Sequence, residues 1–161
     1  LKGIQDIIDI LKDIPSYGLV IAGNGPYYNE LLDLVKKNNL QKKVLFLGYL
    51  EDPKDVYLTT DIICIPSYSE GFPMGLIEAY ANGKSTVVSS ISSFKEICTD
   101  NDSVMFSHSV PNDLVTAIKK ATKNKKHLEK SSVNRYESEF RLKHMGDKYY
   151  RLYNKLVSNH E

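Results

Sequence analysis

The chain has 161 residues, of which 42% are hydrophobic and 25% are charged, and its formal net charge is +1. This composition is typical of one folded domain and excludes disordered and collagen-like proteins. A nucleic-acid-binding protein would carry a basic excess, so we expect no nucleic-acid partner.

Five short apolar runs, rich in β-branched residues and bounded by turn residues, are typical of buried parallel strands. They cover residues 18–23, 43–48, 61–66, 85–90 and 103–107. Between them, apolar residues recur at spacings of three and four, which predicts helices. These patterns cover residues 4–14, 27–39, 53–60, 75–83 and 111–124. The alternation predicts an α/β fold with a doubly wound, Rossmann-like parallel sheet.

Both ends of the pattern differ from a standard doubly wound domain. Such a sheet usually starts with a strand that becomes central, whereas the first element here is a helix. We therefore expect that the first strand is missing from this chain. At the other end, residues 141–161 form a polar helix with an apolar stripe.

The two cysteines, Cys64 and Cys98, lie in apolar surroundings. Buried, reduced thiols are the simplest interpretation, and they fit a cytoplasmic protein. The aspartates at 100 and 102 imitate a metal-binding pair, but they lie in a polar turn, and we expect no metal or other cofactor.

Residues 66–83, PSYSEGFPMGLIEAYANG, form the strongest candidate for a ligand site. They follow a predicted strand, and ligands of open α/β sheets bind beyond the carboxyl ends of the strands. Pro73 suits the first position of a helix, which would leave the N–H groups of Met74, Gly75 and Leu76 free. Free N–H groups at a helix start attract anionic oxygens such as those of a phosphate.

Glu70 and Glu78 flank this helix start. Glu78 would lie one to two turns into the helix, where its carboxylate can accept hydrogen bonds from a vicinal diol such as a ribose. Glu70 would lie across the phosphate site and face the group beyond it. Either glutamate alone would be interpreted as a solvated surface residue.

Seven residues separate the two glutamates, and an alanine-rich turn and a glycine follow before the next strand. This pattern resembles the donor-site signature of retaining glycosyltransferase family four. Its members have the two-domain GT-B fold. LKGIQDIIDIL and LVIAGNGPYYNELLDLV are also similar to the family's C-terminal domain. The resemblance implies that residues 1–140 form a domain that binds the nucleotide sugar. It implies that residues 141–161 form a helix that packs back toward an N-terminal domain absent here.

The resemblance also implies roles for single residues. Glu70 would contact the transferred sugar and Lys2 would pair with the diphosphate, so both are candidate catalytic residues. Further residues implied to bind the sugar donor are Glu78, Phe72, Met74, Gly75, Leu76, Tyr49, Leu50, Gly23 and Gly25. The family's arginine falls before Leu1, and serines replace its usual glycines in residues 89–93, which leaves the sugar undetermined.

The implied reaction is metal-independent transfer of a sugar from a nucleotide diphosphate sugar to an acceptor hydroxyl, with retention at the anomeric carbon. Bacterial surface polysaccharide or glycolipid synthesis is the expected setting. The acceptor glycan or glycolipid would bind through the absent N-terminal domain, so the fragment alone should bind the donor without turnover. The expected location is the cytoplasm, with contact of the full-length enzyme at the inner face of the membrane as a further option.

Two alternatives remain open from the residues. One is a different GT-B enzyme, such as a nucleotide-sugar epimerase. The other is a non-enzymatic, response-regulator-like or flavodoxin-like module that binds a nucleotide or phosphate.

Overall fold

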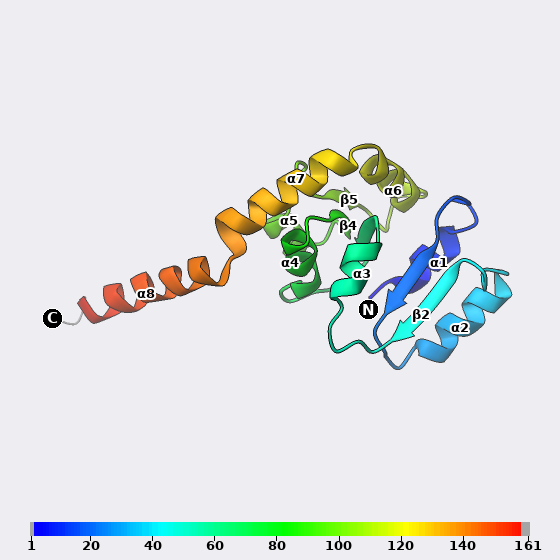
Figure 1. Cartoon of the computed structure of the whole chain (residues 1–161), viewed down its shortest axis with the longest axis horizontal. Helices are drawn as coiled ribbons and strands as arrows, with labels where there is room; N and C mark the ends of the chain where they lie inside the picture. The colour runs from blue at the N-terminus through cyan, green and yellow to red at the C-terminus, as the bar shows by residue number, and fades with distance from the viewer. Residues whose placement is uncertain (1, 159–161) are drawn as a thin grey trace.

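The computed structural model describes residues 2–158, in which strands and helices alternate (Figure 1). The strands are β1 (Leu19–Ala22), β2 (Val44–Gly48), β3 (Ile62–Ile65), β4 (Ser85–Ser89) and β5 (Val104–Phe106). The helices that alternate with them, beginning before β1 and ending after β5, are α1 (Ile4–Ile10), α2 (Tyr28–Lys37), α3 (Lys54–Thr59), α4 (Met74–Ala81), α5 (Ser92–Ile97) and α6 (Asp113–Lys123). Each predicted strand and helix is present, and most are shorter than predicted by one to three residues.

All strand pairings in the described residues are parallel, which confirms the predicted fold class. The strands nevertheless form two separate sheets and not one. β1 pairs with β2, and β3, β4 and β5 form a second sheet in that order. No strand pairing in the described residues joins β1 to β3.

β4 is the most buried strand, and its two faces contact different cores. Val87 belongs to a cluster built with residues of α1, α2 and α6. Val88 belongs to a second cluster, built with residues of α4 and α5. Helices therefore cover both faces of the sheet, as expected for a doubly wound fold.

Helix α1 is shorter than the predicted 4–14. It ends at Ile10, and the N–H groups of Leu11 and Asp13 each bond to a carbonyl three residues earlier, which tightens the chain into turns. Leu11 and Ile14 are still buried. The apolar pattern thus predicted burial correctly although the helix ends early.

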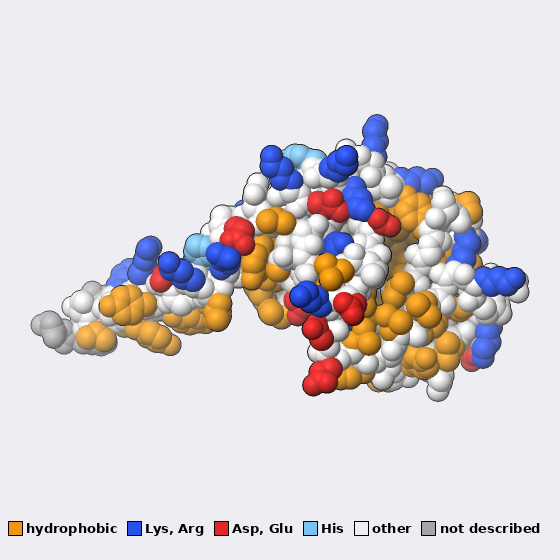
Figure 2. All heavy atoms as spheres, in the orientation of Figure 1, with side chains coloured by type: hydrophobic (Ala, Val, Ile, Leu, Met, Phe, Trp, Pro, Cys, Tyr) orange, Lys and Arg blue, Asp and Glu red, His pale blue; other side chains and the backbone are white. Residues whose placement is uncertain are grey.

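Three further helical segments follow the sheet: α7 (Lys125–Arg135), the π-helix η1 (Tyr136–Phe140) and α8 (Leu142–Ser158). Figure 1 shows that α8 projects away from the rest of the chain. Figure 2 shows apolar side chains along one side of α8 and basic side chains along the other. The exposed apolar residues include Leu142, Met145, Tyr149, Leu152, Tyr153 and Leu156.

The expected packing of this helix on an N-terminal domain stays a prediction. Residues 159–161 of the predicted 141–161 helix lie outside the described residues. Within residues 2–158, the helices are too short or too polar to cross a membrane.

Candidate functional site

A crevice lies where the chain leaves β1 and β3, at the carboxyl ends of the two strands. It has a volume of about 880 Å³ and is bounded by the loop after Ala22, the loop after Ile65 and the start of α1. The chain segments that meet here are far apart in sequence. Ligands of open α/β sheets bind at such an edge.

Lys2 and Glu70 form an ion pair in this crevice. Lys2 Nζ lies 2.7 Å from Glu70 Oε1, and Ser67 Oγ donates a hydrogen bond of 2.6 Å to the same oxygen. The Glu70 side chain is only 12% exposed, whereas that of Lys2 is 67% exposed. Burial alone would raise the pKa of Glu70, but the hydrogen bonds from Lys2 and Ser67 outweigh it and lower this pKa below its ordinary value. The site therefore holds an ionised carboxylate beside an ammonium group that solvent, or an anion, can reach.

Gly3 explains how Lys2 reaches Glu70. Gly3 has a left-handed φ of 66°, and a Cβ at this position would lie 1.9 Å from the carbonyl oxygen of Pro66. Only glycine permits this conformation together with so close an approach. The start of α1 is thereby held against the end of β3.

The start of α4 differs in part from the prediction. Pro73 was expected at the first position of the helix. The helix begins one residue later, at Met74, and Pro73 is its N-cap. The Met74 N–H donates to Phe72 O and the Leu76 N–H donates to Pro73 O, both at 3.0 Å. The expectation of three free N–H groups is therefore wrong for two of them, because a tight turn precedes the helix. Within the described residues the Gly75 N–H has no acceptor, and a Cβ at Gly75 would meet no neighbouring atom.

Glu78 does not line the crevice that contains Glu70. It borders a neighbouring cavity of about 930 Å³, and its Oε2 accepts a hydrogen bond of 2.8 Å from the Tyr57 hydroxyl. Tyr57 lines both cavities, so it lies between the two glutamates. Burial raises the pKa of Tyr57, and the acceptor Glu78 raises it further.

The structure brings most of the other predicted residues to the crevice. Those that line it, besides Lys2 and Glu70, are Gly23, Gly25, Phe72, Met74 and Gly75. Leu76 is fully buried in the core, and neither Tyr49 nor Leu50 lines either cavity. Tyr49 is 75% exposed on the loop after β2. The ligand roles of all these residues stay predictions.

The sequence interpretation missed a cluster beside Glu70, formed by Asp6, Tyr68 and His108. Tyr68 Oη donates to Asp6 Oδ2 at 2.7 Å, and His108 Nδ1 lies 3.1 Å from the same oxygen. The Tyr68 and His108 rings stack with centroids 4.0 Å apart. The cluster fixes the loop of Glu70 to α1 at a second point. One signal was available, because His108 follows a strand at its carboxyl end.

Asp102, half of the pair that imitates a metal site, belongs to a buried structural network. Its Oδ1 accepts hydrogen bonds from the Tyr80 hydroxyl at 2.6 Å and from the Thr99 N–H at 2.9 Å. In the part of the chain that the structure describes, no three His, Cys, Asp or Glu side chains are grouped so that they could hold a metal ion.

Comparison with known proteins identifies relatives of this fold and sequence. A family model described as glycosyl transferases group 1 matches residues 1–138. The O-antigen biosynthesis glycosyltransferase WclY of Escherichia coli is 31% identical over 155 residues, which are 96% of this chain and 44% of WclY. The UDP-Gal:alpha-D-GlcNAc-diphosphoundecaprenol alpha-1,3-galactosyltransferase of Escherichia coli is 34% identical over 79 residues, 48% of this chain and 20% of that enzyme.

Solved structures share the fold. Anabaena HepE, whose structure contains UDP, matches with a TM-score of 0.89 at 18% identity, over 96% of this chain and 45% of HepE. The chain thus spans less than half the length of the relatives it matches. The fold is that of a GT-B glycosyltransferase domain, and neither the epimerase nor the non-enzymatic module is favoured. The chain belongs to the group 1 glycosyl transferase family.

Proposed function

We propose that this chain is the donor-binding half of a retaining glycosyltransferase that moves a sugar from a nucleotide diphosphate sugar to an acceptor hydroxyl. The observation that carries the proposal is that the Lys2–Glu70 pair and Gly75 line one crevice at the carboxyl ends of the strands. A diphosphate needs a cation and a backbone donor. A sugar needs a carboxylate that can accept from its hydroxyl groups. All three groups line this crevice.

Charge builds up on the leaving diphosphate as the glycosidic bond breaks, so stabilisation must be aimed there. A lysine at 4 Å contributes about 4 kcal/mol at a surface-like dielectric. A helix N-terminus contributes about 0.3–2 kcal/mol. Lys2 is therefore the larger of the two contributions, and we propose that the reaction needs no metal ion. Lys2 would exchange part of its contact with Glu70 for the diphosphate.

The relatives suggest the finer details of the reaction. The UDP in HepE and the UDP-Gal of the galactosyltransferase favour a UDP-sugar as donor. WclY favours a growing surface polysaccharide as acceptor, in a bacterium. We propose that the acceptor binds between this domain and an N-terminal domain, and that the apolar stripe of α8 packs on that domain. The free cysteines fit a cytoplasmic enzyme, and an acceptor on a lipid carrier would place it at the inner face of the membrane.

Calorimetry with UDP, UDP-glucose, UDP-galactose and GDP-mannose tests this proposal. We expect a UDP-sugar to bind and Lys2→Ala to weaken the binding of UDP by about tenfold or more, a loss of about 1.4 kcal/mol. Lys12→Ala is the matched control, because Lys12 is an exposed lysine next to α1 and does not line the crevice. Absence of heat with every nucleotide at millimolar concentration would contradict the proposal.

The two glutamates are expected to respond differently. Glu70→Gln should weaken the binding of the UDP-sugar and leave the affinity for UDP unchanged, because this carboxylate is proposed to contact the sugar. Glu78→Ala should weaken the binding of both ligands, because the family resemblance implies that Glu78 holds the ribose, which would reach it in the neighbouring cavity past Tyr57. Equal losses for both ligands in both variants would argue against this assignment.

A further inference from the structure

Ser67 lies beside Glu70 in the loop that follows β3. Its Oγ donates a hydrogen bond of 2.6 Å to Glu70 Oε1. Ser67 is fully buried, whereas the loop residues Tyr68 and Ser69 that follow it are exposed. A buried hydroxyl that is already bonded to a carboxylate acts on a ligand in the crevice only through that carboxylate.

Glu70 uses one of its two oxygens for contacts within the chain. Both hydrogen bonds that it accepts from residues 2–158 end on Oε1, one from Lys2 Nζ at 2.7 Å and one from Ser67 Oγ. Within that part of the chain, Oε2 receives no donor. An ionised carboxylate oxygen without a donor can accept a hydrogen bond from a hydroxyl group of a ligand.

The two donors on Oε1 are held very differently. The Lys2 side chain is long and 67% exposed, so its ammonium group can turn toward an anion in the crevice. The Ser67 side chain has a single rotatable bond to its hydroxyl and no exposed surface. The serine is therefore the donor that stays on Glu70 when the lysine moves.

The backbone around Ser67 is anchored on both sides. Ser89, which is also fully buried, donates a hydrogen bond from its hydroxyl to the Ser67 carbonyl. The carbonyl of the preceding Pro66 lies against Gly3. The hydroxyl of the following Tyr68 donates to a carboxylate of α1 at 2.7 Å. The position of Ser67 Oγ is thus set by contacts that involve neither Lys2 nor a ligand.

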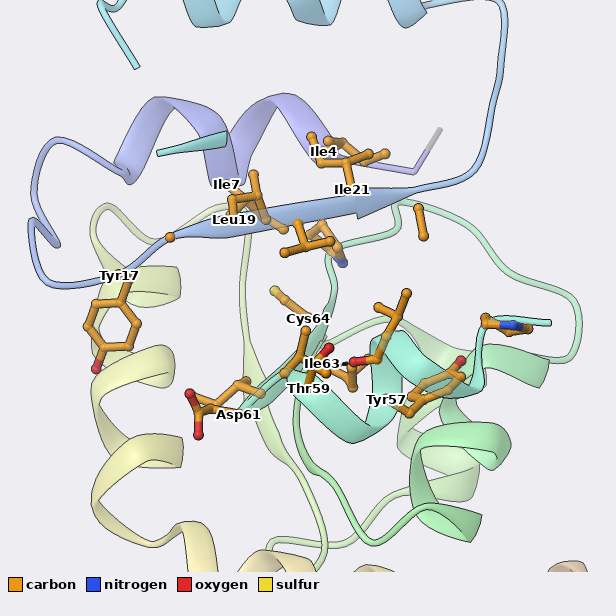
Figure 3. A pocket seen from close by; sticks show the side chains of 18 of the residues that line it. Ile4, Ile7, Tyr17, Leu19, Ile21, Tyr57, Thr59, Asp61, Ile63 and Cys64 are labelled. Atoms are coloured by element: carbon orange, nitrogen blue, oxygen red, sulfur yellow. Dashed lines mark hydrogen bonds between the residues drawn. The ribbon is translucent and has the colours of Figure 1, made fainter. Parts of the chain in front are cut away.

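The donor to the other glutamate is placed differently. Glu78 accepts its hydrogen bond from the Tyr57 hydroxyl, and both residues line the cavity of about 930 Å³. Figure 3 shows Tyr57 and Asp61 at opposite sides of this cavity. Water or a ligand in the cavity can compete for the Tyr57 hydroxyl, whereas burial shields the Ser67 hydroxyl from such competition. A shielded donor is therefore a feature of Glu70 and not of Glu78.

Glu70 needs such a donor when a diphosphate binds. In the proposed function Lys2 then gives up part of its contact with Glu70, whose side chain is only 12% exposed. Burial raises the pKa of Glu70, and the hydrogen bond from Ser67 lowers this pKa independently of Lys2. With the serine in place, the carboxylate stays ionised and oriented while the lysine is engaged elsewhere.

We propose that Ser67 is a positioning residue, whose buried hydroxyl holds Glu70 Oε1 so that Oε2 faces the transferred sugar while Lys2 binds the diphosphate. The inference rests on the proposed function, because it takes Glu70 as the residue that contacts the sugar. It divides the crevice into a fixed carboxylate for the sugar and a movable lysine for the diphosphate. Loss of the Ser67 hydroxyl should therefore affect the sugar and not the nucleotide.

Calorimetry with UDP-glucose, UDP-galactose and GDP-mannose, each compared with UDP or GDP alone, tests this selectivity. We expect Ser67→Ala to weaken binding of the nucleotide sugar by about tenfold and to change the affinity for the free nucleotide by less than about twofold, because only the sugar uses Glu70. Ser85→Ala is the matched control. Ser85 is a fully buried serine at the other end of β4, and its hydroxyl donates to the Ala121 carbonyl.

Ser67→Cys separates the hydrogen bond from packing, because a thiol fills the space of the hydroxyl but is a weak donor. We expect it to bind both ligands as Ser67→Ala does. Carboxyl NMR of the ligand-free chain gives an independent readout. Both Ser67 variants should move the Glu70 titration to higher pH, because burial then acts with one donor fewer, and Ser85→Ala should leave the titration unchanged.

The two readouts decide the inference together. A loss confined to the nucleotide sugar in both Ser67 variants, with the Glu70 titration at higher pH, supports it. Unchanged sugar binding, equal losses for sugar and nucleotide, normal binding by Ser67→Cys or an unchanged Glu70 titration would overturn it and leave the proposed function intact. If the unsubstituted chain binds none of the three nucleotide sugars, the proposed function fails and this inference fails with it.

Discussion

The two sheets of this domain differ in how fully they are enclosed. In the three-stranded sheet, β4 is buried along its whole length, between β3 and β5 and between two layers of helices. In the two-stranded sheet, Val20, Leu45 and Leu47 stay 38% to 55% exposed. In sequence, β1 (LVIA) and β2 (VLFLG) are nevertheless more apolar than the buried β4 (STVVS).

This difference shows that sequence pattern alone does not determine how deeply a strand is buried. A strand with a β-branched, apolar sequence becomes a core element only where neighbours cover both its edges and both its faces. In the described residues β1 and β2 pair only with each other, so each has one edge without a neighbouring strand. The two-stranded sheet should therefore contribute less to stability, and the variants below compare the two regions.

The largest expected effect is in the core of the three-stranded sheet. Phe94 is fully buried in the α4–α5 core, whereas Leu45 of β2 is 55% exposed. We expect Phe94→Ala to lower the free energy of unfolding by about 3–5 kcal/mol, because it leaves a cavity in a packed core. Leu45→Ala should cost about 1 kcal/mol or less. Urea unfolding monitored by circular dichroism measures both, and equal losses would contradict the comparison.

A smaller effect is expected at the two tyrosines that donate to carboxylates. The Tyr80 hydroxyl is buried between Asp102 and Ser103, whereas Tyr57 donates to Glu78 at the exposed cavity. Tyr80→Phe should lower the free energy of unfolding by about 1–3 kcal/mol, because a buried carboxylate loses a donor. Tyr57→Phe should cost well under this, because water can replace the hydroxyl. A larger loss for Tyr57→Phe than for Tyr80→Phe would contradict this interpretation.

The smallest effect concerns pH and the Lys2–Glu70 pair. Because the pKa of Glu70 is lowered in the folded chain, the pair stabilises the fold above the ordinary pKa of 4.5. This contribution is lost as the pH falls through the lowered value. It should be at most about 1 kcal/mol, since Lys2 is largely exposed.

Lys2→Ala should remove this contribution and move the Glu70 titration to higher pH, because burial of the carboxyl remains. Carboxyl NMR titration and urea unfolding from acidic to neutral pH measure the two changes. Lys36→Ala is the control, because it breaks an exposed pair with Asp33 outside the crevice. An unchanged Glu70 titration in Lys2→Ala would show that the pair does not set the pKa.

The sequence was sufficient to predict the order of the strands, most of the helices that alternate with them and the location of the crevice. β-branched runs bounded by turns mark β1 to β5, and the glutamate-bearing loop follows β3, where a doubly wound sheet binds ligands. The close approach of Lys2 to Glu70 was implied only by the family resemblance.

Contacts between distant residues could not be predicted from local pattern. Tyr68 reaches Asp6 across 62 residues, and Tyr57 reaches Glu78 from another helix. The paired N–H groups at the start of α4 also escaped prediction, because the turn of Phe72 and Pro73 depends on the path of the whole loop. These features arise from tertiary packing and have no periodic signature in the sequence.

The most direct test of the donor crevice is a titration of the ¹⁵N-labelled chain with UDP, followed through its amide chemical shifts. We predict that the largest shifts occur at Gly23, Gly25 and Gly75, which line the crevice from two loops. The amides of α8 should not move. Shifts confined to residues outside the crevice, or no shifts at millimolar UDP, would contradict the assignment of this site.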